Sequence, residues 1–284
     1  MSTLIEAKGL SKSYGSHQAL KSVDFKVERG RIVGLVGPNG AGKTTILKAI
    51  LGLTSYEGDL TVLGMNPERQ RHQIMQKVSF IADVAVLPGW LKVANALEFV
   101  TEVHPNFNLE RAKYFLGKTN ISMDAKVKQL SKGMVAQLHL ALVMSIEAEL
   151  LVLDEPTLGL DILYRKEFYN QLLTEFFDEG RSILVTTHQI EEIENLLTDL
   201  IFIRDGKIVL DATMDEVTND YIEVMVSKDN IAQAEALNPV MSRDVFGRKV
   251  YLFQGVSREQ LEVLGELHSP SVADLFVAKM KEGK

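Results

Sequence analysis

The sequence of 284 residues contains no cysteine and a single tryptophan. The lack of cysteine excludes disulfide bonds, thiolate-ligated zinc and thiol nucleophiles, and it is compatible with a cytoplasmic protein. No apolar run reaches the roughly 18–20 residues that a helix needs to cross a bilayer. The first residues also lack the basic and then apolar pattern of a signal peptide. If this protein works at a membrane, we expect another chain to span it.

Basic residues are fewer than acidic ones: 31 Lys and Arg stand against 38 Asp and Glu, which gives a formal net charge of −7. This balance argues against an extended nucleic-acid surface, so we expect no nucleic acid as partner. Hydrophobic residues make up 46% of the chain, an ordinary share for a globular protein. The length allows one large α/β domain and something smaller beside it.

The most informative stretch is Gly-Pro-Asn-Gly-Ala-Gly-Lys-Thr-Thr at residues 37–45, between the apolar run 32–36 and the helix-like run 46–51. A strand, a glycine-rich loop and a helix start in this order predict a phosphate-binding loop for a nucleoside triphosphate. Glycines let backbone N–H groups surround phosphate oxygens, and the helix N-terminus adds partial positive charge. Lys43 would reach the β- and γ-phosphates, and the Thr44 hydroxyl would hold Mg²⁺. The predicted nucleotide-binding residues here are Gly37, Asn39, Gly40, Ala41, Gly42, Lys43, Thr44 and Thr45.

Two carboxylates follow the fully apolar strand predicted at residues 150–153. Asp154 can hold Mg²⁺ opposite Thr44, and Glu155 can polarise a water for attack on the γ-phosphate. A solvated acidic turn after a buried strand is the alternative, and the Lys43-Thr44 pair upstream favours the functional interpretation.

His188 follows the predicted strand 183–187, at the sheet edge where α/β proteins bind ligands. It can hydrogen-bond the γ-phosphate and hold the attacking water, although a lone loop histidine is often only a surface residue. Ser131 precedes an apolar helical pattern and is predicted to cap that helix, offering backbone N–H groups to an anion. On these residues alone, a plain helix start is the better explanation of Ser131.

The rest of the chain alternates strands with helices, which predicts an α/β layered fold. Short strands are expected at 4–7, 23–27, 59–64 and 78–82, helices between 91 and 148, and further helices at 164–179 and 190–197. Asp205-Gly206 between two apolar runs predicts a hairpin. Beyond residue 211 the motifs stop, and strands at 221–226 and 250–253 indicate a small α+β unit that ends in a helix capped by Ser269.

Together these motifs closely resemble the nucleotide-binding ATPase subunit of ABC transporters, over residues 4 to 215. The stretch 37–45 is similar to the Walker A loop, 150–155 to the Walker B strand, and 130–134 to the family signature. Residues 158–161 resemble the D-loop, His188 the switch histidine, and Tyr14 the aromatic residue that stacks on adenine.

The resemblance implies a P-loop NTPase fold of ABC type, with a mixed sheet core, an antiparallel β subdomain and a helical subdomain at about 88–148. The ATPase domain would occupy 1–215 and a small accessory domain 216–284. Catalysis would use Glu155, His188 and Lys43 with ATP and Mg²⁺. Two cassettes, identical or different, would pair head to tail, so that Ser131 and Gly133 of one complete the site of the other.

Two positions depart from the family pattern. Lys132 and Met134 replace the usual glycine and glutamine of the signature, while Ser131 and Gly133 remain. Asp83 stands where the Q-loop glutamine is usual; a carboxylate can still bind Mg²⁺ or water, but it cannot donate a hydrogen bond when ionised.

Two segments suggest which partner protein this chain works with. Residues 84–90 contain Trp90 and correspond to the groove that receives a helix of the membrane subunit, with packing of Trp90 in the chain's own core as the alternative. The segment 269–276 is similar to the closing segment of ATPases from ABC-2-type exporters. We therefore expect an exporter subunit on the cytoplasmic face of the cell membrane; the alternative is a soluble ABC-type ATPase not involved in transport.

Overall fold

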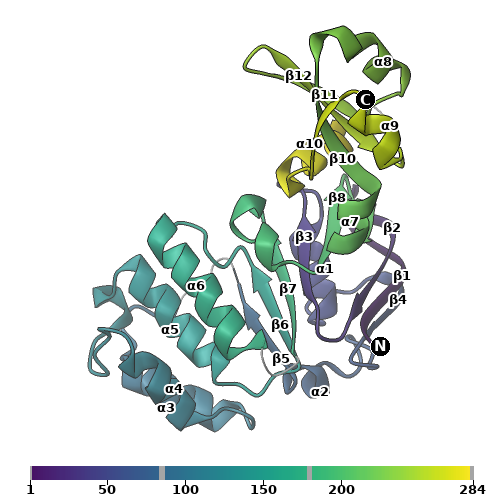
Figure 1. Ribbon diagram of the computed structural model, residues 1–284. Helices are drawn as coiled ribbons and strands as arrows, with labels where there is room; N and C mark the ends of the chain where they lie inside the picture. Colours follow the sequence, from purple (N-terminus) through teal and green to yellow (C-terminus); the bar gives the residue numbers. More distant parts are fainter. Residues whose placement is uncertain (1, 83–86, 178–180, 282–284) are drawn as a thin grey trace.

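The computed structural model describes residues 2–82, 87–177 and 181–281 (Figure 1). Its centre is a six-stranded mixed sheet in the order β5-β6-β7-β3-β8-β9. The first five strands of this order are parallel to their neighbours, and β9 runs antiparallel to β8. The strands are β3 (Ile32–Val36), β5 (Val78–Ile81), β6 (Leu150–Asp154), β7 (Ser182–Thr187), β8 (Asp199–Arg204) and β9 (Lys207–Thr213). The hairpin predicted at Asp205-Gly206 is confirmed.

Alternate residues of the central strands are buried in two different hydrophobic cores, because successive side chains of a strand point to opposite faces of the sheet. Leu150 and Val152 lie in the core that contains α1 (Lys43–Ile50), whereas Leu151 and Leu153 lie in the core that contains α6 (Ile162–Glu175). The all-apolar sequence of β6 follows from burial on both faces.

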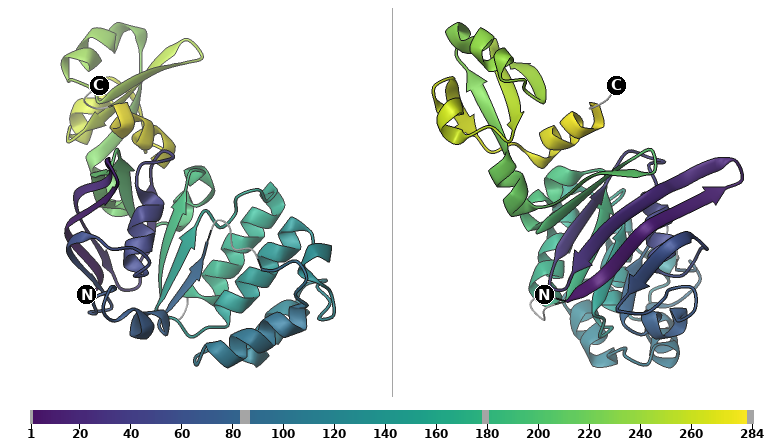
Figure 2. Two further views of the ribbon diagram at one scale, coloured as in Figure 1. Left: turned by 180° about the vertical axis from the view of Figure 1, so that it is seen from behind. Right: turned by 90° about the vertical axis from the view of Figure 1, so that its right-hand side faces the viewer.

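A separate antiparallel sheet covers the α1 side, in the order β2-β1-β4. Its strands are β1 (Thr3–Tyr14), β2 (His17–Glu28) and β4 (Glu57–Val62), and the short helix α2 (Arg71–Met75) follows. The first two strands form a long hairpin that projects from the body (Figure 2, right). They are much longer than the sequence indicated because polar residues in the outer half of the hairpin hide the alternation.

Helices α3 (Val93–Val103), α4 (Leu109–Gly117) and α5 (Lys132–Met144) form a third part with its own core around Leu97, Leu116 and Leu138. A 3₁₀ turn at Val127–Gln129 leads into α5. This part lies beside α6, away from the antiparallel sheet (Figure 1). Ser131, at the start of α5, therefore belongs to this helical part, whereas the phosphate loop belongs to the central sheet.

The C-terminal part forms a four-stranded antiparallel sheet in the order β11-β12-β10-β13 that stands apart from the body (Figures 1 and 2). Its strands are β10 (Tyr221–Val226), β11 (Met241–Val245), β12 (Arg248–Gln254) and β13 (Gly265–His268). Its helices are α7 (Met214–Asp220), α8 (Ile231–Ala236), α9 (Arg258–Glu262) and α10 (Val272–Lys281), with a 3₁₀ turn at Lys228–Asn230.

Helix α10 connects this part to the ATPase body. The Val272 N–H at its start donates to Glu194 Oε2 at 3.2 Å, and Arg204 donates to the Lys279 and Met280 carbonyls near its end, each at 3.0 Å. A carboxylate at the positive end and a guanidinium at the negative end both complement the helix dipole. Phe276 packs edge-on against Phe202 of β8, with ring centroids 5.3 Å apart.

Three predicted helix boundaries are wrong. Residues 190–197 form two short 3₁₀ turns, Ile190–Glu192 and Glu194–Leu196, in place of one α-helix. The C-terminal helix is capped by Ser271, whose Oγ accepts from the Asp274 N–H at 3.0 Å, and not by Ser269. Helix α6 begins at Ile162 rather than at residue 164, because the Asp161 side chain accepts from the N–H groups of its first turn.

Candidate functional site

The loop between β3 and α1 takes a conformation that its glycines permit. Gly40 and Gly42 have φ angles of 80° and 117°, a region that other residues rarely adopt. A Cβ on Gly42 would lie 2.8 Å from the Ala19 carbonyl oxygen, whereas one on Gly40 would meet nothing within 4 Å. Gly42 thus packs the loop against the antiparallel sheet, and Gly40 borders open space.

Lys43 begins α1 and is almost fully buried, with 7% of its surface exposed. Its Nζ donates to the carbonyl oxygens of Gly37, at 2.7 Å, and Pro38, at 3.4 Å. Burial lowers the pKa of the Lys43 ammonium, and the nearby carboxylates of Glu155 and Asp154 act in the opposite direction. The ammonium therefore stands at the mouth of the loop, held by weak neutral acceptors that anionic phosphates can replace.

Asp154, at the end of β6, is held on both carboxylate oxygens. Thr44 Oγ1 donates to Oδ2 at 3.1 Å, and Thr186 Oγ1 on β7 donates to Oδ1 at 2.6 Å. Asp154 is 5% exposed. The structure thus brings two of the predicted magnesium ligands, Thr44 and Asp154, into direct contact, and Thr186, which the sequence did not point to, holds the Asp154 carboxylate from its other side.

Glu155 has a φ of 48°, an unusual backbone conformation for a residue other than glycine. Its N–H donates to the Thr186 carbonyl oxygen at 3.1 Å and contacts Thr186 Oγ1 at 3.2 Å. Its Oε2 lies 2.8 Å from His188 Nδ1 and accepts from the His188 N–H at 3.3 Å. Local strain of this kind is typical of functional sites. This backbone conformation places the Glu155 carboxylate beside His188, the histidine predicted to act with Glu155.

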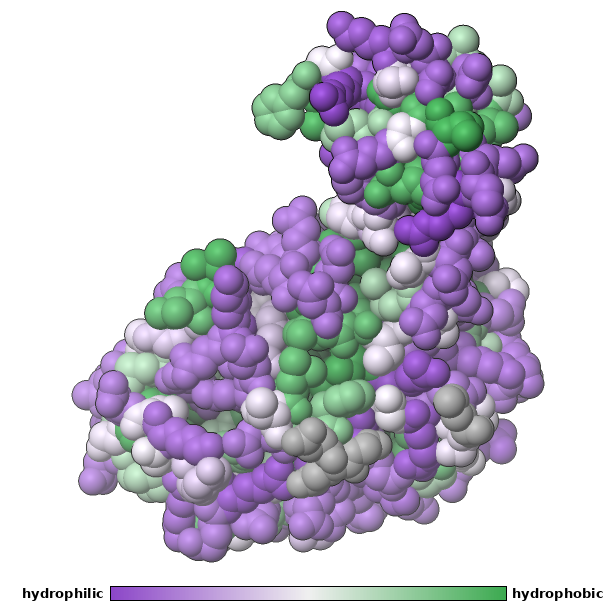
Figure 3. Space-filling model, in the orientation of Figure 1, coloured by the Kyte–Doolittle hydropathy of each residue, from purple (hydrophilic) through white to green (hydrophobic). Residues whose placement is uncertain are grey.

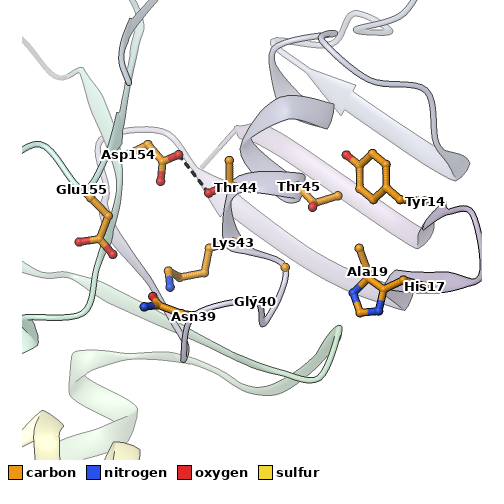
Figure 4. Close-up of a pocket in the computed structure, with 11 residues that line it drawn as sticks. Tyr14, His17, Ala19, Asn39, Gly40, Lys43, Thr44, Thr45, Asp154 and Glu155 are labelled. Atoms are coloured by element: carbon orange, nitrogen blue, oxygen red, sulfur yellow. Dashed lines mark hydrogen bonds between the residues drawn. The ribbon is translucent and has the colours of Figure 1, made fainter. Parts of the chain in front are cut away.

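Lys43, Thr44, Asp154 and Glu155 line a cavity of about 310 Å³ (Figure 4), whereas Thr186 and His188 are not among its lining residues. Its other end is formed by the β1–β2 turn, where Tyr14, which is 47% exposed, pairs with His17. His17 and Ala19 were not singled out in the sequence, although they follow Tyr14 across a two-residue turn. The lining residues are Tyr14, His17, Ala19, Asn39, Gly40, Gly42, Lys43, Thr44, Thr45, Asp154 and Glu155.

The remaining predicted site residues lie elsewhere. Gly37 packs beneath the loop, where a Cβ would approach the Ile203 carbonyl to 2.4 Å, and Ala41 is buried. Ser131 caps α5 as expected, accepting from the Met134 N–H at 3.2 Å, but neither it nor Gly133 lines the cavity of its own chain. Asp83 lies outside the described residues.

The donor set fits Mg²⁺ bound together with a nucleotide. Within the described ranges, no group of three or more His, Asp or Glu side chains is arranged to hold a metal ion by itself. Mg²⁺ is usually bound by one or two protein oxygens, substrate phosphates and waters, rather than by an all-protein cage. Thr44 and Asp154 provide two such oxygens beside a loop built for phosphate.

Comparison with known proteins assigns the family. Residues 20–158 match the family model described as ABC transporter. The lantibiotic transport ATP-binding protein SrtF of Streptococcus pyogenes is 32% identical over 76% of this chain and 93% of its own length. The SkfA peptide export ATP-binding protein SkfE of Bacillus subtilis is 33% identical over 73% and 88%. This chain belongs to the ABC transporter ATP-binding proteins.

Two further comparisons agree with this assignment. The ABC transporter ATP-binding protein YtrB of Bacillus subtilis is 28% identical over 84% of this chain and 83% of its own. A solved structure of an ATP-binding subunit of an ABC transporter superposes with a TM-score of 0.69 at 26% identity, over 76% of this chain and 92% of that one. The P-loop ABC fold and the transporter-driving ATPase activity predicted from the sequence are confirmed. In the part of the chain that the structure describes, none of the helices combines the length and apolar character needed to span a membrane.

Thr186→Val is expected to raise the Mg²⁺ concentration for half-maximal ATP hydrolysis by roughly tenfold. Valine keeps the shape of threonine but removes the hydrogen bond to the Asp154 carboxylate, and such bonds to charged groups contribute about 1.5–3 kcal/mol. The measurement is the ATPase rate against Mg²⁺ at fixed ATP, with Thr61→Val at an exposed position of β4 as control. An unchanged Mg²⁺ dependence would show that Asp154 is oriented without Thr186.

Proposed function

We propose that this chain binds MgATP in the described cavity and hydrolyses it to drive a separate membrane-spanning exporter subunit. The observation that carries the proposal is the convergence of Lys43, Asp154 and Glu155 on one cavity beside a phosphate-binding loop. The exporter assignment draws on relatives whose names specify peptide export and lantibiotic transport.

Each residue has a distinct part in the proposed reaction. Tyr14 stacks on the adenine, and the loop N–H groups with Lys43 bind the phosphates. Thr44 and Asp154 hold Mg²⁺, which would neutralise charge on the β- and γ-phosphates. Glu155 accepts a proton from the attacking water. His188 hydrogen-bonds the γ-phosphate and holds the attacking water in place. The contact between Glu155 and His188 keeps the two groups within reach of one water molecule.

A second cassette completes the site in this proposal. Ser131 and Gly133 lie outside the cavity of their own chain; Ser131 is exposed and so accessible to the γ-phosphate of a partner, whereas Gly133 is buried beside Tyr164. Leu158, Ile162 and Leu163 are 53%, 69% and 71% exposed around the D-loop and the start of α6. Figure 3 shows apolar side chains gathered over that end of α6. Large exposed apolar side chains in a cluster are typical of an association surface.

Trp90 supports docking of a membrane subunit. It is 72% exposed, so the alternative in which it packs into the core of the helical part is wrong. Exposed tryptophan is enriched among residues that dominate binding energy at interfaces. Residues 84–86 of the same predicted groove lie outside the described residues. Docking at Trp90 would keep the ATPase at the cytoplasmic face of the membrane.

The test is co-purification from detergent-solubilised membranes with the tagged chain. The parent is expected to retain a membrane-spanning protein, and Trp90→Ala to lose most of it, while Tyr114→Ala on α4, another exposed aromatic, retains it. Recovery of the parent with ribosomes or without any membrane protein would favour the alternative of an ATPase not involved in transport.

A further inference from the structure

The contact between Glu155 and His188 joins two segments that follow neighbouring strands of the central sheet, β6 and β7. One is the loop of residues 156–161 that follows Glu155 and leads into α6. The other is the segment of residues 189–196 that follows His188 and consists of two short 3₁₀ turns. Such turns have poorer hydrogen-bond geometry than an α-helix and are used in short pieces as connectors. The pairing of β6 with β7 and the His188 N–H bond to Glu155 Oε2 bring the two residues together. The 2.8 Å separation of Glu155 Oε2 and His188 Nδ1 then also depends on how the two following segments are held against each other.

Arg165, in the first turn of α6, forms this connection. Its Nε donates to the Leu160 carbonyl oxygen at 2.6 Å, within the loop after Glu155. Its Nη1 donates to Glu192 Oε1 at 2.7 Å and to Gln189 Oε1, the side chain next to His188. One rigid guanidinium thus holds acceptors on both segments at once.

The surroundings strengthen this bridge. The side chains of Arg165 and Glu192 are only 19% and 25% exposed, so solvent screens their attraction weakly. Burial raises the pKa of neighbouring Tyr169 to about 12, with the charges of Glu192 and Glu155 acting in the same direction. Tyr169 stays neutral, with its hydroxyl 3.3 Å from Thr157 Oγ1, and the charge of Arg165 is balanced by Glu192.

We infer that Arg165 is a positioning residue for ATP hydrolysis, which holds the segment after His188 against the loop after Glu155 and so sets the distance between these two groups. Arg165 does not line the nucleotide cavity. Its loss should therefore affect the chemical step and leave nucleotide binding in place. The inference rests on the proposed roles of Glu155 and His188.

The proposed positioning role requires the planar, forked guanidinium of arginine, not only its positive charge. Lysine keeps the positive charge for Glu192, but its single ammonium cannot span acceptors on two segments in the fixed fork of arginine. Arg165→Lys should therefore preserve folding while loosening the bridge. Arg165→Met removes the charge as well and leaves the Glu192 carboxylate without its counter-ion. The neighbouring Lys166 is exposed, and Lys166→Met serves as the matched control.

The experiment measures kcat, KM for MgATP and the dissociation constant for ATP on the full chain. Arg165→Lys is expected to lower kcat at least tenfold and to change the dissociation constant less than twofold, while Lys166→Met matches the parent. In ¹H–¹³C spectra the ring signals of His188, assigned with His188→Gln, should shift in Arg165→Lys and stay in place in Lys166→Met. This second measurement does not depend on activity.

The outcomes are distinguishable. Parental kcat and unchanged His188 signals in Arg165→Lys would overturn the inference. So would a loss of kcat that is matched by lower thermal stability and weaker ATP binding, because that pattern indicates a structural role only. If Glu155→Gln hydrolyses ATP at the parental rate, the proposed role of Glu155 fails instead, and the fault does not lie with Arg165.

Discussion

Glu155→Gln is expected to lower ATP turnover by roughly 10²- to 10⁴-fold, the usual contribution of a positioned general base. Glutamine has nearly the same shape as glutamate and can still contact His188, but its amide cannot accept a proton from water. Lys43, Thr44 and Asp154 are unaltered in this variant, so ATP binding should stay within about twofold of the parent. ATP would then persist in the site and hold two cassettes together.

Two measurements test this expectation. Steady-state hydrolysis gives the loss of turnover, and size-exclusion chromatography with light scattering, with and without MgATP, reports whether an ATP-dependent dimer forms. Glu98→Gln on α3, an exposed carboxylate far along the chain, is the control. Parental turnover in Glu155→Gln would remove this residue from the role of base. A persistent monomer that binds ATP would mean that closure needs the membrane subunit or a different cassette.

Lys43→Met is expected to weaken ATP binding by roughly 10- to 100-fold and to abolish measurable hydrolysis. Hydrogen bonds between a buried ammonium and an anion contribute about 1.5–3 kcal/mol, and each 1.4 kcal/mol is a tenfold change in affinity. Methionine fills much of the volume of the lysine stem, so the loop and α1 should keep their packing. The Gly37 and Pro38 carbonyl oxygens lose a donor; Pro38 is exposed, so water can replace the donor there, whereas Gly37 is buried.

Titration calorimetry with ATP measures the affinity, and thermal unfolding without nucleotide reports on the fold. The matched control is Lys48→Met, because Lys48 also lies on α1 but is exposed. ATP affinity equal to that of the parent in Lys43→Met would contradict the assignment of this cavity as the phosphate site.

The parts of the site that the sequence predicted are those carried by contiguous residues. The phosphate loop between β3 and α1 needs glycines and a lysine at fixed offsets, so its pattern is visible in the chain itself. Thr186 and Arg165 carry no such pattern. Each acts by reaching a residue more than 20 positions away, Asp154 in one case and Gln189 in the other. Only the register of β6 beside β7 and the placement of α6 bring these pairs together.

The wrong helix at 190–197 has a similar origin. Ile190, Ile193 and Leu197 are all buried, at spacings of three and four that match an α-helix better than a 3₁₀ turn with its three residues per turn. The packing of this segment between α6 and α10 selects the tighter turns. The predicted cap at Ser269 is wrong because α10 begins at Val272, where Ser271 Oγ accepts the Asp274 N–H and the Glu194 carboxylate accepts the Val272 N–H.

The sequence by itself predicted the α/β fold class and the nucleotide-binding loop, because these follow from local periodicity and from motifs a few residues long. The family and its ATPase activity followed from the resemblance of those motifs to ABC ATPases. Tertiary structure alone decided that Asp154 is oriented from β7, that Trp90 is exposed, and that Arg165 links the segments after Glu155 and His188. Contacts between distant segments depend on the packing of whole elements, and side-chain packing at one position depends on many others at once. No short stretch of sequence encodes them.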